Sequence, residues 1–314
     1  MVKEKPVLTI LVPTADRHEL LPETLRNIQQ EVRRYQVSPT LYVVDNASNP
    51  PVQQELCESF GFDLIRFDDR VDIGNSILRT AELAKTDYVW VFGDDDYMCG
   101  GALACVYDVL LNHNPDVLYL NHYIATNDMT AIIYSSHKPE VEDVQIMTGA
   151  EAARRFTHHP GFISSLIFRP SLLQDGQEIE RQFPGYGFLG AIYKNSVDKK
   201  FAYYTKPLVI QRRSTVLWKK SWPIYWLITV PEMFKWLEET VSAQGVYQAA
   251  RREVNVSAWR TLITARALGY GPSDEFWRKS SAHLIARNKL LSCIIRYGLP
   301  QWLAFKIYRW GKRS

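Results

Sequence analysis

The apolar positions of the first hundred residues follow two alternating spacings. Short continuous apolar runs are typical of strands buried on both faces of a sheet. They cover residues 7–13, 40–45, 62–67 and 88–93. Between them, apolar residues recur at helical spacing. These segments are 20–34, 52–61 and 74–85. Strands and helices alternating in this way predict an α/β fold, with a parallel sheet flanked by helices.

After about residue 115 the pattern changes. Residues 116–125 and 131–138 predict a β-hairpin, residues 149–159 a helix, and residues 161–170 and 202–211 further strands. From Trp222 onward the spacing is helical, with breaks at Gly269–Pro272 and Gly298–Pro300. We therefore expect an α/β domain over residues 1–215 and a helical C-terminal region over residues 216–314.

Composition limits the classes of partner and compartment. The formal net charge of +3 over 314 residues is too small to indicate nucleic-acid binding, so no nucleic-acid partner is expected. Four cysteines without paired spacing indicate neither a metal site nor a disulfide framework, which favours a reducing compartment. Residues 1–10 lack the apolar core of a signal peptide, and no run reaches the roughly 18 apolar residues of a membrane span. These features predict a cytoplasmic chain.

Charge and tryptophan are unevenly distributed. Eight of the nine tryptophans lie between Trp218 and Trp310. No acidic residue follows Glu275, but nine cations do: Arg278, Lys279, Arg287, Lys289, Arg296, Lys306, Arg309, Lys312 and Arg313. Residues 299–314 mix aromatic and basic side chains, as in a helix that lies on an anionic membrane surface. The alternative is a helix packed on the protein core with its charges in solvent.

Three acidic turns follow predicted strands: "PTADR" (13–17), "DNAS" (45–48) and "GDDD" (93–96). Ligands of parallel α/β sheets bind beyond the carboxyl ends of the strands. An anionic phosphate in such an acidic cleft needs a bridging cation, and Mg²⁺ or Mn²⁺ accepts carboxylate oxygens. In an extended segment Asp94 and Asp96 would point to one side. The alternative is that these aspartates cap a helix that begins near Gly100.

The ordered segments "LTILVPTADRHELLPETLRNI", "LYVVDNAS" and "VDIGNSILRTAELAKTDYVWVFGDDD" resemble the nucleotide-sugar half of the family-2 glycosyltransferases, which have the GT-A fold. The resemblance covers residues 6–110 well and extends loosely to residue 215. The form "YVWVFGDDD" is similar to that of bacterial enzymes that add sugars to O-antigen or capsule intermediates, such as abequosyltransferase-like proteins. The fold that the resemblance implies agrees with the α/β pattern.

The resemblance implies a donor-binding set. It comprises Pro13, Thr14, Asp16, Asp45, Asn46, Asn75, Arg79, Asp94, Asp95, Arg212 and Arg213. Asp45 would bind the nucleotide base, Asp94 and Asp96 would hold the metal with Asp96 preferred as direct ligand, and Arg212 or Arg213 would neutralise the leaving diphosphate. The residues also allow other roles: Asp45 could cap a turn, Arg79 could be a solvated helix residue, and the arginine pair could lie on the surface.

The sequence does not identify a single general base. Inverting members of this family carry an acidic base at the start of a helix late in the core, but the corresponding residues 182–194 contain no Asp or Glu. The candidates nearby are Asp175, Glu178, Glu180, His158 and His159. The histidines qualify because imidazole suits proton transfer near neutral pH.

Taken together, these features predict a metal-dependent, inverting glycosyltransferase of surface polysaccharide synthesis. Its partners would be a nucleotide-diphosphate sugar and a glycan linked to a polyprenyl diphosphate, at the inner face of the cell membrane. One alternative is a nucleotidyltransferase, but residues 13–19 lack the glycine- and cation-rich loop that this chemistry needs. The other is a non-catalytic module that binds a nucleotide or glycan, which the missing acid in residues 182–194 supports.

Overall fold

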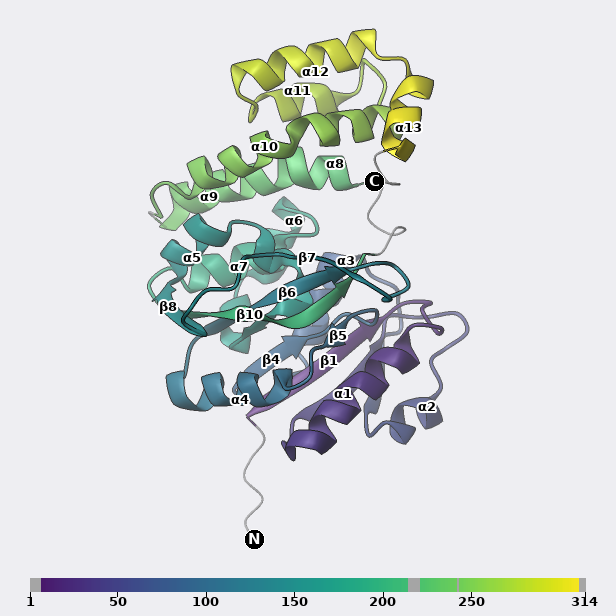
Figure 1. The fold of residues 1–314 in the computed structure, drawn as a ribbon, viewed down its shortest axis with the longest axis vertical. Helices are drawn as coiled ribbons and strands as arrows, with labels where there is room; N and C mark the ends of the chain where they lie inside the picture. Colours follow the sequence, from purple (N-terminus) through teal and green to yellow (C-terminus); the bar gives the residue numbers. More distant parts are fainter. Residues whose placement is uncertain (1–6, 214–220, 242, 311–314) are drawn as a thin grey trace. The chain divides into compact units, whose positions relative to one another are not determined.

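A computed structural model describes residues 7–213, 221–241 and 243–310 (Figure 1). These residues form two compact units. The sheet unit contains residues up to 152 and residues 159–213, and the helical unit contains residues 153–158 and those after 220. The domain boundary expected at residues 215 and 216 lies outside the described residues.

The sheet unit is built on one mixed sheet. Among the described residues its strands are β1 (Leu8–Thr14), β2 (Thr40–Asp45), β3 (Asp63–Arg66), β4 (Tyr88–Val91), β5 (Tyr97–Met98), β6 (Val117–Ala125), β7 (Ile132–Ser135), β8 (Val144–Thr148), β9 (Leu166–Phe168) and β10 (Lys200–Arg212). The main order is β3-β2-β1-β4-β9-β6-β10-β5, with β7 beside β6 and β8 beside β10. β3, β2, β1, β4, β6 and β10 run in one direction, so the sheet is mostly parallel.

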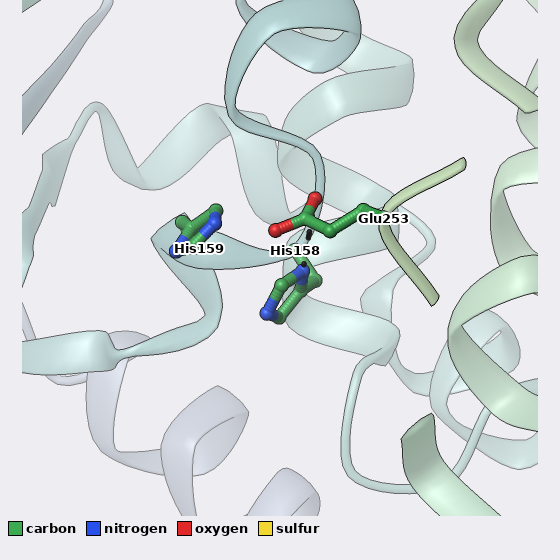
Figure 2. A group of neighbouring side chains, drawn as sticks. All are labelled: His158, His159 and Glu253. Carbon is green, nitrogen blue, oxygen red and sulfur yellow. Dashed lines mark ion pairs between the residues drawn. The ribbon is translucent and has the colours of Figure 1, made fainter. Parts of the chain in front are cut away.

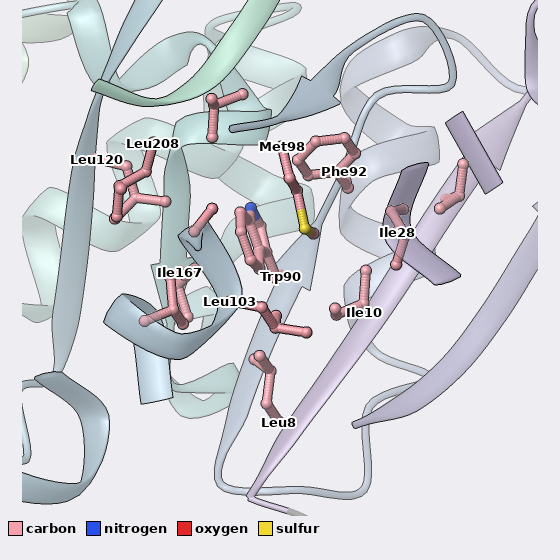
Figure 3. Close-up of a cluster of buried hydrophobic side chains, with 14 of the residues drawn as sticks. Leu8, Ile10, Ile28, Trp90, Phe92, Met98, Leu103, Leu120, Ile167 and Leu208 are labelled. Carbon is pink, nitrogen blue, oxygen red and sulfur yellow. The ribbon is translucent and has the colours of Figure 1, made fainter. Parts of the chain in front are cut away.

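Helices cover both faces of this sheet. They are α1 (Leu21–Tyr35), α2 (Gln54–Ser59), α3 (Ile73–Ala81), α4 (Ala102–His113), α6 (Gly176–Gln182) and α7 (Gly187–Asn195), whereas α5 (Gly149–Phe156) begins in the sheet unit and ends in the helical unit. Leu8 and Ile10 of β1 share one face because strand side chains alternate, and they pack with Trp90 of β4, Ile28 of α1 and Leu103 of α4 (Figure 3). The opposite face of β1 and β4 packs against α3. Burial on both faces explains the continuous apolar runs of these strands.

Most elements predicted for the first 138 residues are confirmed, including the antiparallel hairpin of β6 and β7. The strand predicted over residues 161–170 is confirmed only in part, because it is shorter than expected. Two 3₁₀ turns, η1 (His159–Gly161) and η2 (Ile163–Ser165), precede β9, which is only three residues long. β9 lies between β4 and β6 and is antiparallel to both. Pro160, which has no backbone N–H to donate, lies inside the first turn.

The helical unit has its own core. Its elements are α8 (Trp222–Ile224), the π-helix η4 (Tyr225–Thr229), α9 (Val230–Val241), α10 (Val246–Ala267), α11 (Glu275–Ser281), α12 (Ala286–Gly298) and α13 (Gln301–Trp310). Leu227, Ala258, Leu262, Trp277 and Leu284 are among its buried residues. The predicted breaks at Gly269–Pro272 and Gly298–Pro300 are confirmed, because they separate α10 from α11 and α12 from α13. Within the described ranges, no helix has the length and apolar character needed to cross a bilayer.

Candidate functional site

The carboxyl ends of β1 and β2 lie side by side. Pro13 pairs with Val44 and Thr14 with Asp45 in the parallel register, and the backbone N–H of Asn46 donates to the Thr14 carbonyl at 2.9 Å. Thr14 and Asn46 are buried. The turns that follow these strands therefore begin at adjacent points on one edge of the sheet.

Asp45 is fully buried at the end of β2. Its carboxylate accepts the backbone N–H groups of Ser48 at 2.8 Å and Val52 at 3.1 Å and pairs with Arg66. Burial acts to raise the pKa of Asp45, but the hydrogen bonds from Ser48 and Val52 and the charge of Arg66 outweigh it, so the pKa is lowered. Asp45 is thus an ionised carboxylate that holds the turn after β2.

Asp16 and Asn46 join this turn to the loops after β1 and β3. Asp16 has a left-handed backbone, with φ of 58°. Its carboxylate accepts the N–H of Asn49 at 2.7 Å and pairs with Arg70 at 2.6 Å. The Asn46 amide binds both backbone groups of Val71, donating at 2.9 Å and accepting at 3.0 Å. Three strand ends are therefore tied into one rim.

Asn75 and Arg79 lie on α3, next to this rim. The carboxylate of Asp72 caps α3 and accepts the Asn75 backbone N–H at 3.0 Å and its side-chain amide at 2.7 Å. The Arg79 guanidinium stacks on the ring of Phe67, 4.2 Å from its centroid. Arg79 is thus held in place by Phe67, the residue that follows β3, which does not fit the alternative of a freely solvated side chain.

The three aspartates after β4 form a turn, and the expected extended segment is wrong. β4 ends at Val91, and the N–H of Asp96 donates to the Gly93 carbonyl at 3.4 Å. Alternation of side chains along a strand therefore does not apply. Arg17 contacts both Asp94, at 2.9 Å, and Asp95, at 2.6 Å, whereas Asp96 turns to other partners.

The aspartates do not cap the next helix. β5 intervenes, α4 begins only at Ala102, and its N-cap residue is Gly101. The N–H of Gly101 donates to the carboxylate of Glu31 at 2.9 Å. The helix-capping alternative for Asp94, Asp95 and Asp96 is therefore excluded by their position.

Asp96 is buried between two donors. Its Oδ2 accepts the Ser164 hydroxyl at 2.6 Å, and its Oδ1 accepts the Arg212 backbone N–H at 3.1 Å. Ser164 Oγ also accepts the N–H of Gly93 at 2.8 Å. Burial and the adjacent charge of Asp95 raise the pKa of Asp96 well above its usual range. This carboxylate is therefore fixed in orientation by neighbours from β10 and η2.

Asp94 offers an oxygen that is free to bind a cation. Its Oδ1 accepts from Arg17, but its Oδ2 is buried and has no hydrogen-bond partner in the described part of the chain. Burial raises the pKa of Asp94 to about 6. An unpaired buried oxygen beside a second oriented carboxylate is a donor set that suits a hard divalent cation. Asp94 and Asp96 thus fit the ion expected from the sequence.

The two candidate arginines have different environments. The Arg212 guanidinium is buried, and it donates to the carbonyls of Asp95 at 3.1 Å and Asn127 at 2.7 Å and to the Glu23 carboxylate at 3.1 Å. The Arg212 side chain therefore stabilises the aspartate turn through the Asp95 carbonyl. Arg213 is exposed, and its backbone N–H donates to the Ala125 carbonyl at 3.1 Å. Of the two, only Arg213 has its side chain exposed to solvent.

Sequence reasoning missed three contributors to the aspartate turn. Arg17 is its counter-ion, Ser164 orients Asp96, and the Thr24 hydroxyl contacts the Asp94 carbonyl at 3.0 Å and the Asp96 carbonyl at 3.2 Å. A signal existed for Arg17, since it is the only Lys or Arg in the three acidic turns. No comparable signal marks Ser164, because its role depends on η2, which the apolar pattern does not reveal.

Glu180 contacts the segment 182–194, which contains no carboxylate of its own. It is buried, and it accepts the backbone N–H groups of Gly185 and, at 2.7 Å, of Gly187, the first residue of α7. Burial raises its pKa to about 7. Gly74 of α3 packs so closely that a Cβ there would overlap this carboxylate. Both oxygens of Glu180 are therefore engaged in holding the start of α7.

The other four base candidates have different partners. Asp175 pairs with Lys194 at 2.7 Å, and Glu178 is exposed on α6. His158 belongs to the helical unit, where it pairs with Glu253 at 3.7 Å (Figure 2). His159 belongs to the sheet unit, where its ring lies 4.8 Å from that of His137. It opens the segment that ends in Ser164 and Ser165.

Comparisons with known proteins place the chain in a family. The model of glycosyl transferase family 2 matches residues 9–173. Abequosyltransferase RfbV of Salmonella typhimurium (strain LT2) is 23% identical over 328 residues, covering 93% of each chain.

Solved structures show a similar fold. S. aureus TarS in complex with UDP has a TM-score of 0.58 at 13% identity, covering 97% of this chain and 91% of that one. The mannosyltransferase PcManGT from Pyrobaculum calidifontis, in complex with GDP-Man and Mn²⁺, has a TM-score of 0.51 at 15% identity, covering 98% and 85%. The expected GT-A fold is confirmed.

Proposed function

Since this chain belongs to glycosyltransferase family 2, we propose that it transfers a sugar from a nucleotide-diphosphate donor to a glycan with the help of Mg²⁺ or Mn²⁺. The observation that carries the proposal is the unpaired buried oxygen of Asp94 beside the oriented carboxylate of Asp96. Both lie at the carboxyl end of a parallel strand, where ligands of such sheets bind. The complexes of similar folds with UDP and with GDP-Man and Mn²⁺ support the same class of donor.

Different residues of the chain would bind different parts of the donor. The rim made by Asp16, Asp45 and Asn46 would receive the nucleoside, and Asp94 and Asp96 would hold the ion. When bound, the ion would supply positive charge to the departing diphosphate. Arg213 would add a second cation there, because its side chain is exposed, whereas that of Arg212 is committed to the protein.

For the acceptor half we favour His159 as the base of an inverting reaction. Glu180 is buried and holds the start of α7 through two backbone N–H groups, Asp175 is paired, and His158 belongs to the helical unit. His159 is half-buried, and it starts the segment whose Ser164 contacts Asp96. An imidazole at this place could accept the proton of an acceptor hydroxyl near neutral pH.

The acceptor that we propose is a lipid-linked glycan of surface polysaccharide synthesis, of the O-antigen or capsule type. The enzyme would act in the cytoplasm, peripherally at the inner face of the cell membrane. Two features support this: similarity to an abequosyltransferase, and the exposed aromatic side chains of Tyr297, Trp302 and Phe305, which lie on helices that contain Lys and Arg but no Asp or Glu. The segment expected to lie on the membrane extends to residue 314, and its last four residues lie outside the described ones.

The test of metal-dependent donor binding uses Asp96→Asn, which keeps the shape of the side chain. Thermal shifts with UDP, GDP, CDP and dTDP, each with and without Mn²⁺, would identify the nucleotide that binds to the unmodified protein. Asp96→Asn should abolish the Mn²⁺-dependent part of that shift. Asp87→Asn is the matched control, because Asp87 is exposed just before the other end of β4. Native metal-dependent binding by Asp96→Asn would reject the site.

Transfer assays then separate an enzyme from a non-catalytic binding module. Each of the five base candidates is replaced in turn, by Gln or Asn. His159→Gln should leave donor binding unchanged and reduce transfer by about 10²-fold or more. Near-native transfer by His159→Gln would show that another residue is the base. Donor binding without transfer or donor hydrolysis in the unmodified protein would favour the binding module.

A further inference from the structure

An apolar groove in the helical unit is lined by residues of α10 and α12 and by Ile307 of α13. Its volume is about 690 Å³, within the range of about 300–1,000 Å³ that small-molecule sites occupy. The aliphatic and aromatic side chains that line it are Val256, Trp259, Ile263, Ile285, Leu291, Ile294, Ile295, Leu299 and Ile307. Trp259 is 45% exposed and Ile294 56% exposed. The groove thus presents apolar surface to solvent.

The two amides in the groove wall are already used by the protein. Asn255 donates to the carbonyls of Arg251 at 2.7 Å and His283 at 3.0 Å and accepts the Ile285 N–H at 2.9 Å. Asn288 donates to the Asn255 carbonyl at 2.8 Å. These bonds hold the start of α12 against α10. The NH₂ groups of both amides and the Asn255 oxygen are therefore already bonded within the protein.

The one charged side chain in the lining is cationic. Arg287 is exposed, and no carboxylate of the described residues pairs with it. Lys289 of α12 is also exposed and unpaired in the described structure, but it lies outside the lining of the groove. The sequence has no Asp or Glu after Glu275. An anion at the Arg287 end of the groove would therefore meet positive charge without competing carboxylates.

We infer that this groove binds the hydrocarbon chain of a membrane lipid whose phosphate contacts Arg287. The inference deepens the proposed lipid-linked acceptor and rests on that proposal for the identity of the lipid. An apolar groove with a cation at its edge suits an amphiphile with an anionic head group, because the hydrocarbon leaves water while the head group still has a charged partner. Each methylene removed from water strengthens binding about fourfold.

The test uses full-length protein and alkyl phosphates below their micellar concentration, with binding measured by calorimetry. Dodecyl phosphate should bind at least a hundredfold more tightly than butyl phosphate, and inorganic phosphate should give no measurable binding. α12 offers two matched pairs of variants. Ile294→Glu is compared with Leu290→Glu, because both residues are exposed and only Ile294 lines the groove. Arg287→Ser is compared with Lys289→Ser for the same reason.

Ile294→Glu and Arg287→Ser should each weaken dodecyl phosphate binding about tenfold or more, and the two controls should change it less than twofold. Equal loss in both members of a pair would mean adsorption to the surface and would overturn the inference. Equal affinity for dodecyl and inorganic phosphate would also overturn the inference. The same holds if the unmodified protein is a dimer that Ile294→Glu dissociates. Mn²⁺-dependent nucleotide binding is measured on every variant. If it persists while lipid binding is absent, only the groove assignment fails.

Discussion

The Ser164 hydroxyl lies 2.6 Å from Oδ2 of Asp96, although 68 positions separate the two residues in the sequence. The contact exists because β9 lies between β4 and β6, which brings the preceding 3₁₀ turn to the end of β4. Ser164 also binds the N–H of Gly93 at 2.8 Å. One hydroxyl therefore links the aspartate turn to a segment from the second half of the sheet unit.

Replacing Ser164 with Ala should weaken metal-dependent nucleotide binding by about 10- to 100-fold, as is usual when the partner that orients a metal ligand is lost. Calorimetry with Mn²⁺ and the preferred nucleotide measures this. The control is Ser165→Ala in the same turn, whose hydroxyl donates to the Phe162 carbonyl at 2.6 Å. If both variants bind like the unmodified protein, Ser164 does not orient a metal ligand.

Arg17 should act as the counter-ion of Asp94 and Asp95 when no metal is bound. Among the described residues, only the Arg17 guanidinium pairs with the carboxylates of Asp94 and Asp95, so Arg17→Gln should cost about 2 kcal/mol of unfolding free energy without metal. Because Mn²⁺ would replace the lost charge, its stabilising effect should be larger in Arg17→Gln than in the unmodified protein.

Denaturant unfolding with and without Mn²⁺ measures both quantities. Arg70→Gln is the matched control, since Arg70 pairs with Asp16 at 2.6 Å and both side chains are more than 40% exposed. Its effect should stay below about 1 kcal/mol. A smaller Mn²⁺ effect in Arg17→Gln would instead show that Arg17 assists metal binding.

Stability should depend on pH through Glu180. Its pKa of about 7 lies above its ordinary value of 4.5. Between these values the folded chain binds a proton that the unfolded chain has lost, so unfolding free energy falls as pH rises, by at most about 1.4 kcal/mol per pH unit. Glu180→Gln should flatten this decline between pH 5 and 7, whereas Glu178→Gln, exposed on the same helix, should not. Parallel curves for all three proteins would contradict the prediction.

α13 should hold the protein on anionic vesicles. Trp302 is 62% and Phe305 46% exposed, whereas Ala304 is fully buried, so deletion of the helix would disturb the core and point changes are preferable. Trp302→Ser with Phe305→Ser should reduce sedimentation with anionic vesicles at low salt, and added salt should weaken binding of the unmodified protein. Leu111→Ser, 63% exposed in the sheet unit, should have no effect. Unmodified protein that ignores such vesicles would exclude this role.

The sequence determined the elements whose signals are local. A strand buried on both faces must be apolar throughout, so β1, β2 and β4 could be located from composition alone. Acidic turns at the ends of such strands could be assigned to one edge of the sheet, because parallel strands end together. Helix breaks at Gly298 and Pro300 follow from backbone conformation, which also acts over a few residues.

Tertiary structure decided which side chains meet. Asp94 and Asp95 share Arg17 because residues 93–96 turn, and a turn of four polar residues leaves no periodic signal. Glu180 reaches the start of α7 from α6 only because the two helices pack together. Ser164 reaches Asp96 because β9 joins the sheet antiparallel to its neighbours. Such contacts depend on packing between distant segments, and that packing is set by the whole core.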